Sequence, residues 1–182
     1  MIHASYSMLY DLLIVILHNI RSMHNVGSIF RTADAAGCEK IYLCGITPAP
    51  LDKFGRKRQP IIKVSLNAED YIPWEYTKST TRLLNRLKKD GYAILAVEQS
   101  KKSIPYFTFS PQSRRGQTSA KSKIALVLGN EIKGLPRSVL NRADKILEIP
   151  MRGQKESLNV AVAFGIIVFK LSQIILPPPS QK

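Results

Sequence analysis

The sequence predicts an α/β domain with a mostly parallel sheet and helices on both faces. Short apolar runs alternate with segments of helical periodicity along the chain. Runs such as LLIVIL at 12–17 and IALVLG at 124–129 are apolar throughout, as expected of strands buried on both faces. The chain has 182 residues, 45% of them hydrophobic, which is enough for one domain with a buried core. We therefore expect a single domain over residues 1–176 and a disordered tail, PPPSQK, over 177–182.

Strands are expected where apolar runs are bounded by turn residues. Such runs occupy residues 12–17, 40–46, 92–98, 124–129 and 145–150. Ligands of open parallel sheets bind at the carboxyl ends of the strands. The polar, glycine-containing phrases LGNEIKG and IPMRGQKESLN begin at the ends of the last two runs. These phrases are therefore the first candidates for a binding site.

Helices are expected between these runs. A helix over 26–36 is closed by Gly37, and a helix over 79–89 stops at Asp90 and Gly91. Pro136 suits the first turn of a short helix. The final helix is expected within 157–176, with Ser157 as a possible N-cap. The segments 47–60 and 99–123 show no regular pattern, so we expect basic loops there.

The charge of the chain is strongly positive. Lys and Arg number 27 against 13 acidic residues, which gives a formal net charge of +14 and a pI near 10.0. This excess favours a polyanionic partner, either nucleic acid or an acidic membrane surface, and of the two we expect nucleic acid. The alternative is a basic surface that serves only solubility.

Several classes of protein are not supported. Cys38 and Cys44 form no CxxC pattern, so we expect reduced thiols in a cytoplasmic protein rather than a disulfide framework. No histidine lies at a recognisable ligand spacing, so we expect no metal site. The run at 12–17 is too short to span a membrane, and 157–176 contains Asn159 and Lys170. A buried or interface-facing helix suits that segment better than a span. No GxGxxG or GxxxxGK[ST] motif occurs.

Three segments together carry the candidate chemistry. They are NIRSMHNVGSIFRTADAAG at 19–37, ALVLGNEIKGLP at 125–136 and IPMRGQKESLNVAVAFG at 149–165. Their order and spacing resemble the SpoU/TrmH family of RNA ribose methyltransferases, which belongs to the SPOUT superfamily. The resemblance covers nearly the whole chain and implies methyl transfer from S-adenosylmethionine to a ribose 2′-hydroxyl in tRNA or rRNA. It also implies a homodimer and a C-terminal trefoil knot.

The first segment holds the residue on which the chemistry would depend most. Asn19, Arg21, Asn25, Gly27 and Arg31 match the family's first motif, with Arg31 on its catalytic arginine and Asn25 on a site asparagine. An arginine is a poor base, because its pKa exceeds ~12. It can instead hold a phosphate with its planar fork and stabilise charge developing on the ribose oxygen. The alternative is an exposed helical arginine, or one paired with Asp34; the acceptor of the hydroxyl proton stays open.

The second and third segments would hold the cofactor. The resemblance makes Gly129, Ile149, Met151 and Leu158 cofactor contacts and Val97, at the end of its strand, a lesser one. It further implies a catalytic role for the polar residues Glu131, Ser157 and Asn159. The Glu131 carboxylate is expected to orient Arg31. Read locally, Gly129 is a small residue that allows a close backbone approach, and Glu131 is a solvated turn residue.

RNA binding is expected from basic residues outside these contacts. The candidates are Arg21, Lys53, Arg56, Lys57, Arg58, Arg114 and Arg115. Each cation on a phosphate adds affinity that does not depend on sequence. Tyr106, Phe107 and Phe109 either stack on exposed bases or anchor their own loop. No separate RNA-binding domain precedes the first motif, so target recognition is expected to come from the core, its loops and the dimer.

Two other functions remain open. A SPOUT enzyme that methylates a base is one, although the pairs Asn25–Arg31 and Ser157–Asn159 resemble those of ribose methyltransferases. A non-catalytic RNA-binding protein on the same fold is the other.

Overall fold

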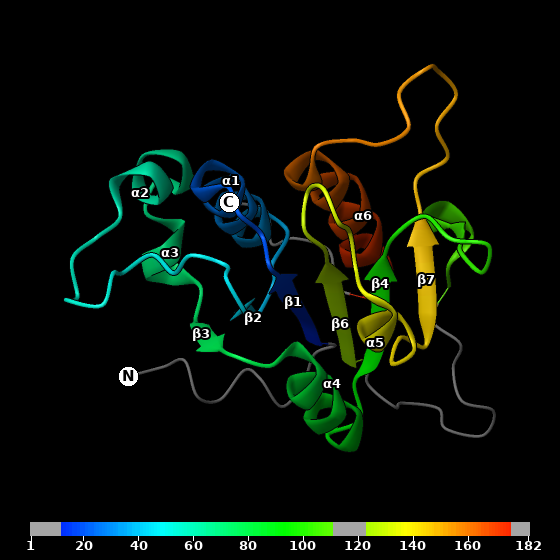
Figure 1. Cartoon of the computed structure of the whole chain (residues 1–182), viewed down its shortest axis with the longest axis horizontal. Helices are drawn as coiled ribbons and strands as arrows, with labels where there is room; N and C mark the ends of the chain where they lie inside the picture. The colour runs from blue at the N-terminus through cyan, green and yellow to red at the C-terminus, as the bar shows by residue number, and fades with distance from the viewer. Residues whose placement is uncertain (1–11, 111–122, 176–182) are drawn as a thin grey trace.

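A seven-stranded parallel sheet forms the centre of the molecule (Figure 1). The computed structural model describes residues 12–110 and 123–175. The strand order is β3-β2-β1-β6-β4-β7-β5, and every neighbouring pair is parallel. The strands are β1 Leu12–His18, β2 Lys40–Cys44, β3 Trp74–Thr77, β4 Ala93–Val97, β5 Ile104–Pro105, β6 Lys123–Leu128 and β7 Lys145–Glu148. The predicted α/β class with a parallel sheet is confirmed.

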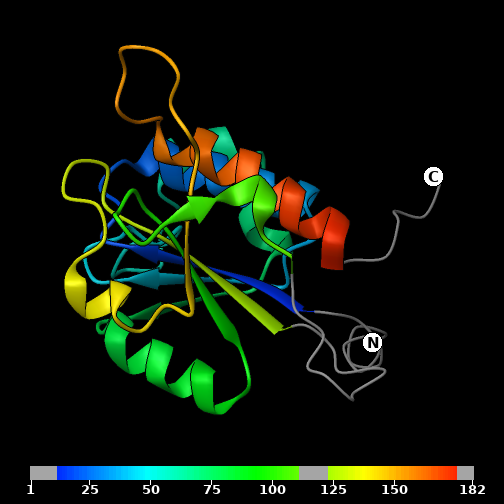
Figure 2. The ribbon, with the colours of Figure 1, turned by 90° about the vertical axis from the view of Figure 1, so that its right-hand side faces the viewer.

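Helices cover both faces of this sheet (Figure 2). Helices α1 and α6 pack on one face with α2 and α3 beside α1, while α4 and α5 cover the other. The helices are α1 Met23–Ala35, α2 Gln59–Ser65, α3 Ala68–Tyr71, α4 Thr80–Lys89, α5 Arg137–Leu140 and α6 Val160–Ile175, with a short 3₁₀ helix, η1, at Tyr106–Thr108. No helix among the described residues is long and apolar enough to cross a membrane.

The continuous apolar runs are explained by the two layers of helices. In β1, Leu13, Val15 and Leu17 join the core beneath α1 and α6, whereas Ile14 and Ile16 join the core beneath α4 and α5. All five are at most 2% exposed. Because successive side chains of a strand point to opposite faces, a strand covered on both faces needs apolar residues at every position.

The register brings the carboxyl ends of the central strands level with one another. Leu17 of β1 pairs with Leu128 of β6, and Leu128 pairs with Val97 of β4. The chain leaving each strand therefore emerges at the same edge of the sheet. Ser22 ends the β1–α1 connection as the N-cap of α1, and its side chain accepts a hydrogen bond from the Asn25 N–H.

Several expected boundaries are wrong. Helix α1 begins at Met23 rather than at 26, because the Ser22 cap lies earlier than expected. The final helix begins at Val160, and the Ala161 N–H bonds to Asn159 Oδ1, so Asn159 rather than Ser157 caps it. Regular elements also occupy segments expected to be loops or left unassigned, namely α2, α3, β3, β5 and η1. The expected tail at 177–182 lies outside the described residues.

Candidate active site

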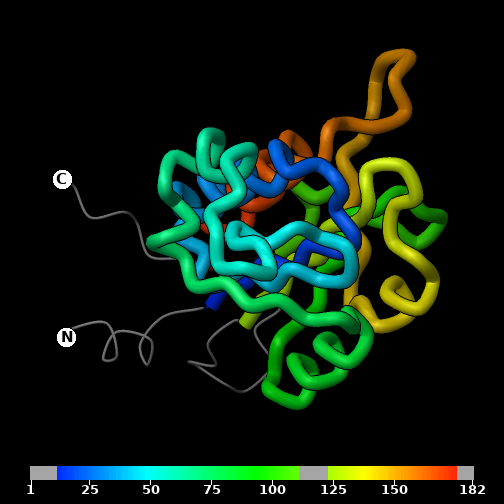
Figure 3. The backbone as a smooth tube through the Cα atoms, turned by 60° about the vertical axis from the view of Figure 1, so that its left-hand side comes forward, coloured from blue at the N-terminus to red at the C-terminus, as the bar shows by residue number. Residues whose placement is uncertain are grey.

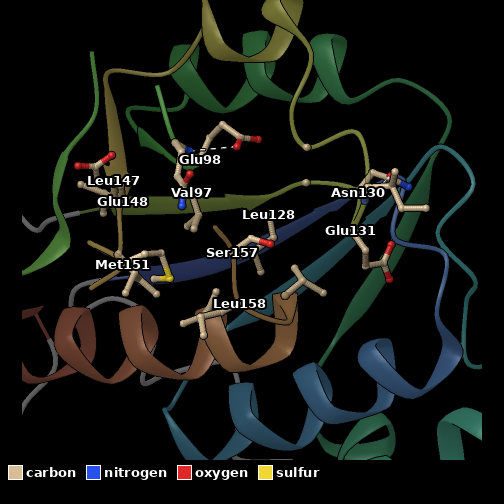
Figure 4. A pocket seen from close by; sticks show the side chains of 17 residues that line it. Val97, Glu98, Leu128, Asn130, Glu131, Leu147, Glu148, Met151, Ser157 and Leu158 are labelled. Atoms are coloured by element: carbon tan, nitrogen blue, oxygen red, sulfur yellow. Dashed lines mark hydrogen bonds between the residues drawn. The ribbon is translucent and has the colours of Figure 1, made fainter. Parts of the chain in front are cut away.

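A pocket of about 220 Å³ opens at the carboxyl edge of the sheet. The ends of β4, β6 and β7 form one side of it, and the segment from Ile149 to the first turn of α6 forms the other. Figure 4 shows Met151, Ser157 and Leu158 on the α6 side, with Glu148 and Glu131 toward opposite ends. Part of that connecting segment stands out from the body of the protein as a loop (Figure 3). The pocket lies where parallel sheets usually bind ligands.

All five residues expected to contact the cofactor line this one pocket. They are Val97, Gly129, Ile149, Met151 and Leu158. Two expected catalytic residues, Glu131 and Ser157, line it as well. Among the apolar lining residues that sequence reasoning missed are Leu147, Val160 and Ala163. Their signal was available, because Leu147 lies within a predicted strand and the other two lie in the first turn of the last helix.

The pocket wall formed by residues 129–136 is held in shape from within the protein. A Cβ on Gly129 would lie 2.7 Å from the backbone carbon of Gly134 and 2.8 Å from the nitrogen of Leu135. Gly134 itself has φ +62°, and the Leu135 N–H donates to Glu98 Oε2 at 2.7 Å. Gly129 is therefore required by the close approach of this segment's own backbone, in addition to any approach of a ligand.

Glu131 connects this wall to the beginning of α1. Its carboxylate accepts hydrogen bonds from the backbone N–H of Arg21 at 3.0 Å, from that of Ser22 at 3.1 Å and from Asn25 Nδ2 at 3.0 Å. Partial burial alone would raise the pKa of Glu131, but these donors lower it overall. Glu131 is thus a carboxylate with fixed orientation. Within the described part of this chain it forms no hydrogen bond to Arg31, so an orienting role toward Arg31 stays a prediction.

Asn25 extends the connection to the third motif segment. Asn159 Nδ2 donates to Asn25 Oδ1 at 3.0 Å, and Asn25 Nδ2 donates to Glu131. The three side chains form a continuous hydrogen-bonded row, and each comes from a different motif segment. The sequence predicted all three as site residues, and the structure brings them together.

Arg31 lies elsewhere. It is six residues beyond Asn25 on α1, which corresponds to ~9 Å along a helix axis. Its side chain is exposed, does not line the pocket and forms no hydrogen bond or ion pair within 12–110 and 123–175, including the alternative pair with Asp34. The fold of one chain therefore leaves Arg31 available to a partner.

The predicted basic cluster at 53–58 is partly neutralised. Lys57 pairs with Asp70 at 2.7 Å, and Arg56 pairs with Asp52 at 2.8 Å. Arg58 is half-buried, whereas Lys53 is exposed beside the Phe54 ring. Exposed pairs of this kind can exchange their acidic partner for a phosphate at little cost. The candidates Arg114 and Arg115 lie outside the described residues.

The aromatic residues of the β5–η1 segment divide between the two expected roles. Tyr106 and Phe109 pack against the hydrophobic core and anchor the segment. Phe107 is 56% exposed and meets Tyr106 edge to face, with 5.5 Å between ring centroids. Only Phe107 is therefore available for stacking on a base.

The parallel sheet with a pocket at its carboxyl edge is the architecture of a class of RNA-modifying enzymes. An S-adenosylmethionine-bound rRNA methyltransferase from Sinorhizobium meliloti superposes with a TM-score of 0.76, at 27% identity over 90% of this chain and 57% of that one. The TrmH/SpoU tRNA-modifying enzyme of A. aeolicus gives a TM-score of 0.73 at 28% identity, covering 91% of this chain and 76% of the other.

The sequence comparisons identify the family. Residues 12–169 match the SpoU rRNA Methylase family, and the chain belongs to this family. The 23S rRNA (guanosine-2′-O-)-methyltransferase RlmB of Neisseria meningitidis serogroup B is 32% identical over 156 residues, which cover 86% of this chain. That alignment spans 56% of the RlmB length, so the present chain matches little more than half of this relative.

Proposed function

We propose that this protein transfers a methyl group from S-adenosylmethionine to a ribose 2′-hydroxyl of a tRNA or rRNA. The observation that carries the proposal is the convergence of all three motif segments on one pocket and its margin. Membership of the SpoU family and the likeness to an S-adenosylmethionine-bound relative support the same activity.

The chemistry of the pocket fits this cofactor. Val97, Ile149 and Leu158 offer apolar surface for an adenine ring. The pocket is lined by three carboxylates, Glu98, Glu131 and Glu148, and by no Lys or Arg among the described residues, although the chain as a whole carries a net charge of +14. Negative charge in an otherwise basic protein suits a ligand with a cationic sulfonium and ammonium group.

The reaction would require little beyond positioning. When bound, the cofactor would supply an activated methyl group. The ribose 2′-oxygen would bond to the methyl carbon as the carbon–sulfur bond breaks with its electron pair staying on sulfur, and the hydroxyl proton would pass to solvent water. We assign the cofactor contacts to Ile149, Met151 and Leu158. Ser157, which lines the pocket, and the Glu131–Asn25–Asn159 row, which hydrogen bonds hold in a fixed geometry, would orient the ribose.

We further propose that the enzyme acts as a homodimer through the exposed face of α6. Val162 and Phe169, seven residues apart on one side of this helix, are 52% and 44% exposed, and adjoining exposed apolar side chains mark an interaction surface. Arg31 lies on α1, which packs beside α6. An isologous contact there would bring Arg31 of the partner subunit toward the pocket, where it could hold the substrate phosphate.

Two further features are proposals from the resemblance. One is a trefoil knot in the C-terminal part, where the segment 129–136 and the segment before α6 form the pocket together. The other is a cytoplasmic location, which agrees with two free cysteines, both buried, and with an RNA substrate. We also propose that residues 12–175 act as a single domain.

Methylation of RNA with isotope-labelled S-adenosylmethionine, followed by digestion to nucleosides, tests the activity. The substrate is tRNA or rRNA from cells that lack the gene, and we expect the label in 2′-O-methylated nucleosides. Label in a methylated base would favour the base-methylating alternative. RNA binding without any methyl transfer would favour the non-catalytic alternative.

A further inference from the structure

A second cavity, of about 430 Å³, lies at the same edge of the sheet. It is formed around the ends of β1 and β6 and the connection that follows β2. Asn130, Ile132 and Gly134 line both this cavity and the first pocket. The segment 129–136 is therefore a common wall, with one cavity on each side of it.

The charge of the second cavity is opposite to that of the first. Arg21 and Lys133 line it, and no carboxylate does so among the described residues. Both cationic side chains are exposed, and neither forms an ion pair within the described part of the chain. Two free cations around a concave surface suit an anionic group, and the guanidinium of Arg21 suits a phosphate in particular.

The polar floor of this cavity is fixed by hydrogen bonds. His18 Nδ1 lies 2.7 Å from Thr80 Oγ1, and His18 Nε2 lies 3.1 Å from Asn19 Nδ2. Asn19 Oδ1 accepts from the Ile46 N–H at 3.0 Å, and Asn130 Nδ2 donates to the Asn19 carbonyl at 2.7 Å. Asn19 adopts φ +56° to make these contacts, which a residue with a bulkier side chain rarely does. The floor thus has a defined shape before any ligand arrives.

The rim of the cavity is apolar. Ile46 and Ile132 are 66% and 77% exposed, and both line the cavity. Large aliphatic side chains beside free cations offer the two kinds of surface that a nucleotide needs, one for the flat base or sugar and one for the phosphate.

We propose that this second cavity binds a nucleotide of the RNA substrate that neighbours the methylated one. Its phosphate contacts Arg21 and Lys133, and its base or sugar lies against Ile46 and Ile132. This inference rests on the proposed function, because the common wall sets the nucleotide in the second cavity next to the ribose presented to the first pocket. The cavity then contributes to the alignment of the strand as well as to its affinity.

A pair of double variants with equal changes of charge tests this proposal. Arg21→Gln with Lys133→Gln removes both cations of the cavity. Lys89→Gln with Lys145→Gln removes two exposed cations at the opposite edge of the sheet, where α4 ends and β7 begins. A short, fluorescein-labelled single-stranded RNA of random sequence is titrated against wild type and both variants over a range of salt concentrations.

We expect the cavity variant to bind this RNA about tenfold more weakly than wild type. The slope of log affinity against log salt should become shallower by about 1.4, because two phosphate contacts are lost and each contributes ~0.7 on a single strand. The control should stay within about twofold of wild type, because its cations lie outside the path of the strand. Equal losses in both variants would overturn the proposal in favour of general charge attraction.

A second substitution addresses the cavity itself. Ile46→Glu places a carboxylate beside the two cations at a largely exposed position, so the fold should tolerate it. We expect weaker RNA binding with unchanged affinity for S-adenosylhomocysteine, and unchanged RNA binding would contradict the proposal. The RNA titrations need no methyl transfer. A wild type that binds RNA through this cavity but neither binds the cofactor nor transfers methyl would refute the proposed function alone.

Discussion

Asn159 Nδ2 donates a hydrogen bond to Asn25 Oδ1 at 3.0 Å and so joins the start of α6 to the first turn of α1. The same Asn159 side chain caps α6 through its Oδ1. One residue therefore combines a structural role with a place in the row that ends at Glu131.

Substitutions at Asn159 can separate these two roles. Asn159→Ala removes the cap and the link, so we expect a loss of ~1 kcal/mol in stability together with reduced turnover. Asn159→Ser retains an oxygen suited to capping but does not reach Asn25, so stability should return while turnover stays low. Thermal melts and single-turnover methylation on the same preparations provide the comparison. If Asn159→Ser restores both properties, the link to Asn25 has no part in the reaction.

Arg31→Ala should lower turnover by roughly 10²–10³, the loss expected from removing one preorganised electrostatic donor. The melting temperature should stay unchanged, because the side chain is exposed and has no partner within the described residues. Affinity for the cofactor should also stay unchanged. Arg31→Lys should recover little activity, since an ammonium group lacks the planar fork.

A mixing experiment shows which subunit supplies Arg31. Arg31→Ala and Glu131→Gln chains are each expected to be inactive alone. If Arg31 acts across the interface, a mixed dimer combines an intact Glu131 with an intact Arg31 of the partner subunit and regains one working site. If Arg31 acts within its own chain, the mixture stays inactive.

Gly129 and Leu158 should respond differently to substitution, although both line the pocket. Gly129→Ala forces a Cβ to within 2.8 Å of the backbone of residues 134 and 135, so we expect a clear drop in melting temperature along with weaker cofactor binding. Leu158→Ala removes a side chain that is 40% exposed and should leave the melting temperature nearly unchanged. Its loss of apolar contact should still weaken S-adenosylhomocysteine binding by about tenfold. Calorimetry that shows normal affinity in Leu158→Ala would move the cofactor away from α6.

His18 predicts a dependence of stability on pH. Burial lowers the pKa of His18 from its ordinary value of 6.5, and Nε2 accepts from Asn19 only while the ring is neutral. The His18 ring therefore binds a proton more readily in the unfolded chain than in the folded one. The stabilisation that neutral His18 gives the folded state is present above pH ~6.5 and is lost as the pH falls below that value. Urea unfolding of the wild type should show this loss between about pH 7 and pH 5.5, and His18→Gln should show a smaller one over the same interval.

The central strands could be predicted from the sequence because burial on two faces requires a continuous apolar run. Strand β1 was expected at 12–17 and spans Leu12–His18. Strand β3 escaped notice because it is a four-residue edge strand without fully buried residues, and β5 has only two residues. Helix α2 was hidden in a basic stretch, where Pro60 looked like a loop residue but instead occupies the first turn of the helix.

The residues that make up the site could be predicted from the sequence, but the hydrogen bonds between them could not. Residues at the carboxyl ends of parallel strands must meet at one edge, so Val97, Gly129 and Ile149 could be grouped in advance. The bonds of Glu131 to the N-H groups of Arg21 and Ser22 span about 110 positions, and no local pattern encodes them. Arg31 lies on the side of α1 that faces away from the core, and only the packing of α1 on the sheet determines which side that is.

The placement of β1 in the middle of the sheet has a consequence for synthesis on the ribosome. β1 is the first strand of the described chain, yet one of its two neighbours is β6. At ~5–20 residues per second, the roughly one hundred residues that separate them take about 5–20 s to synthesise. For that interval one side of an almost wholly apolar strand has no partner, and such an edge invites pairing with another chain. We therefore expect the emerging polypeptide to aggregate less when chaperones act at the ribosome exit.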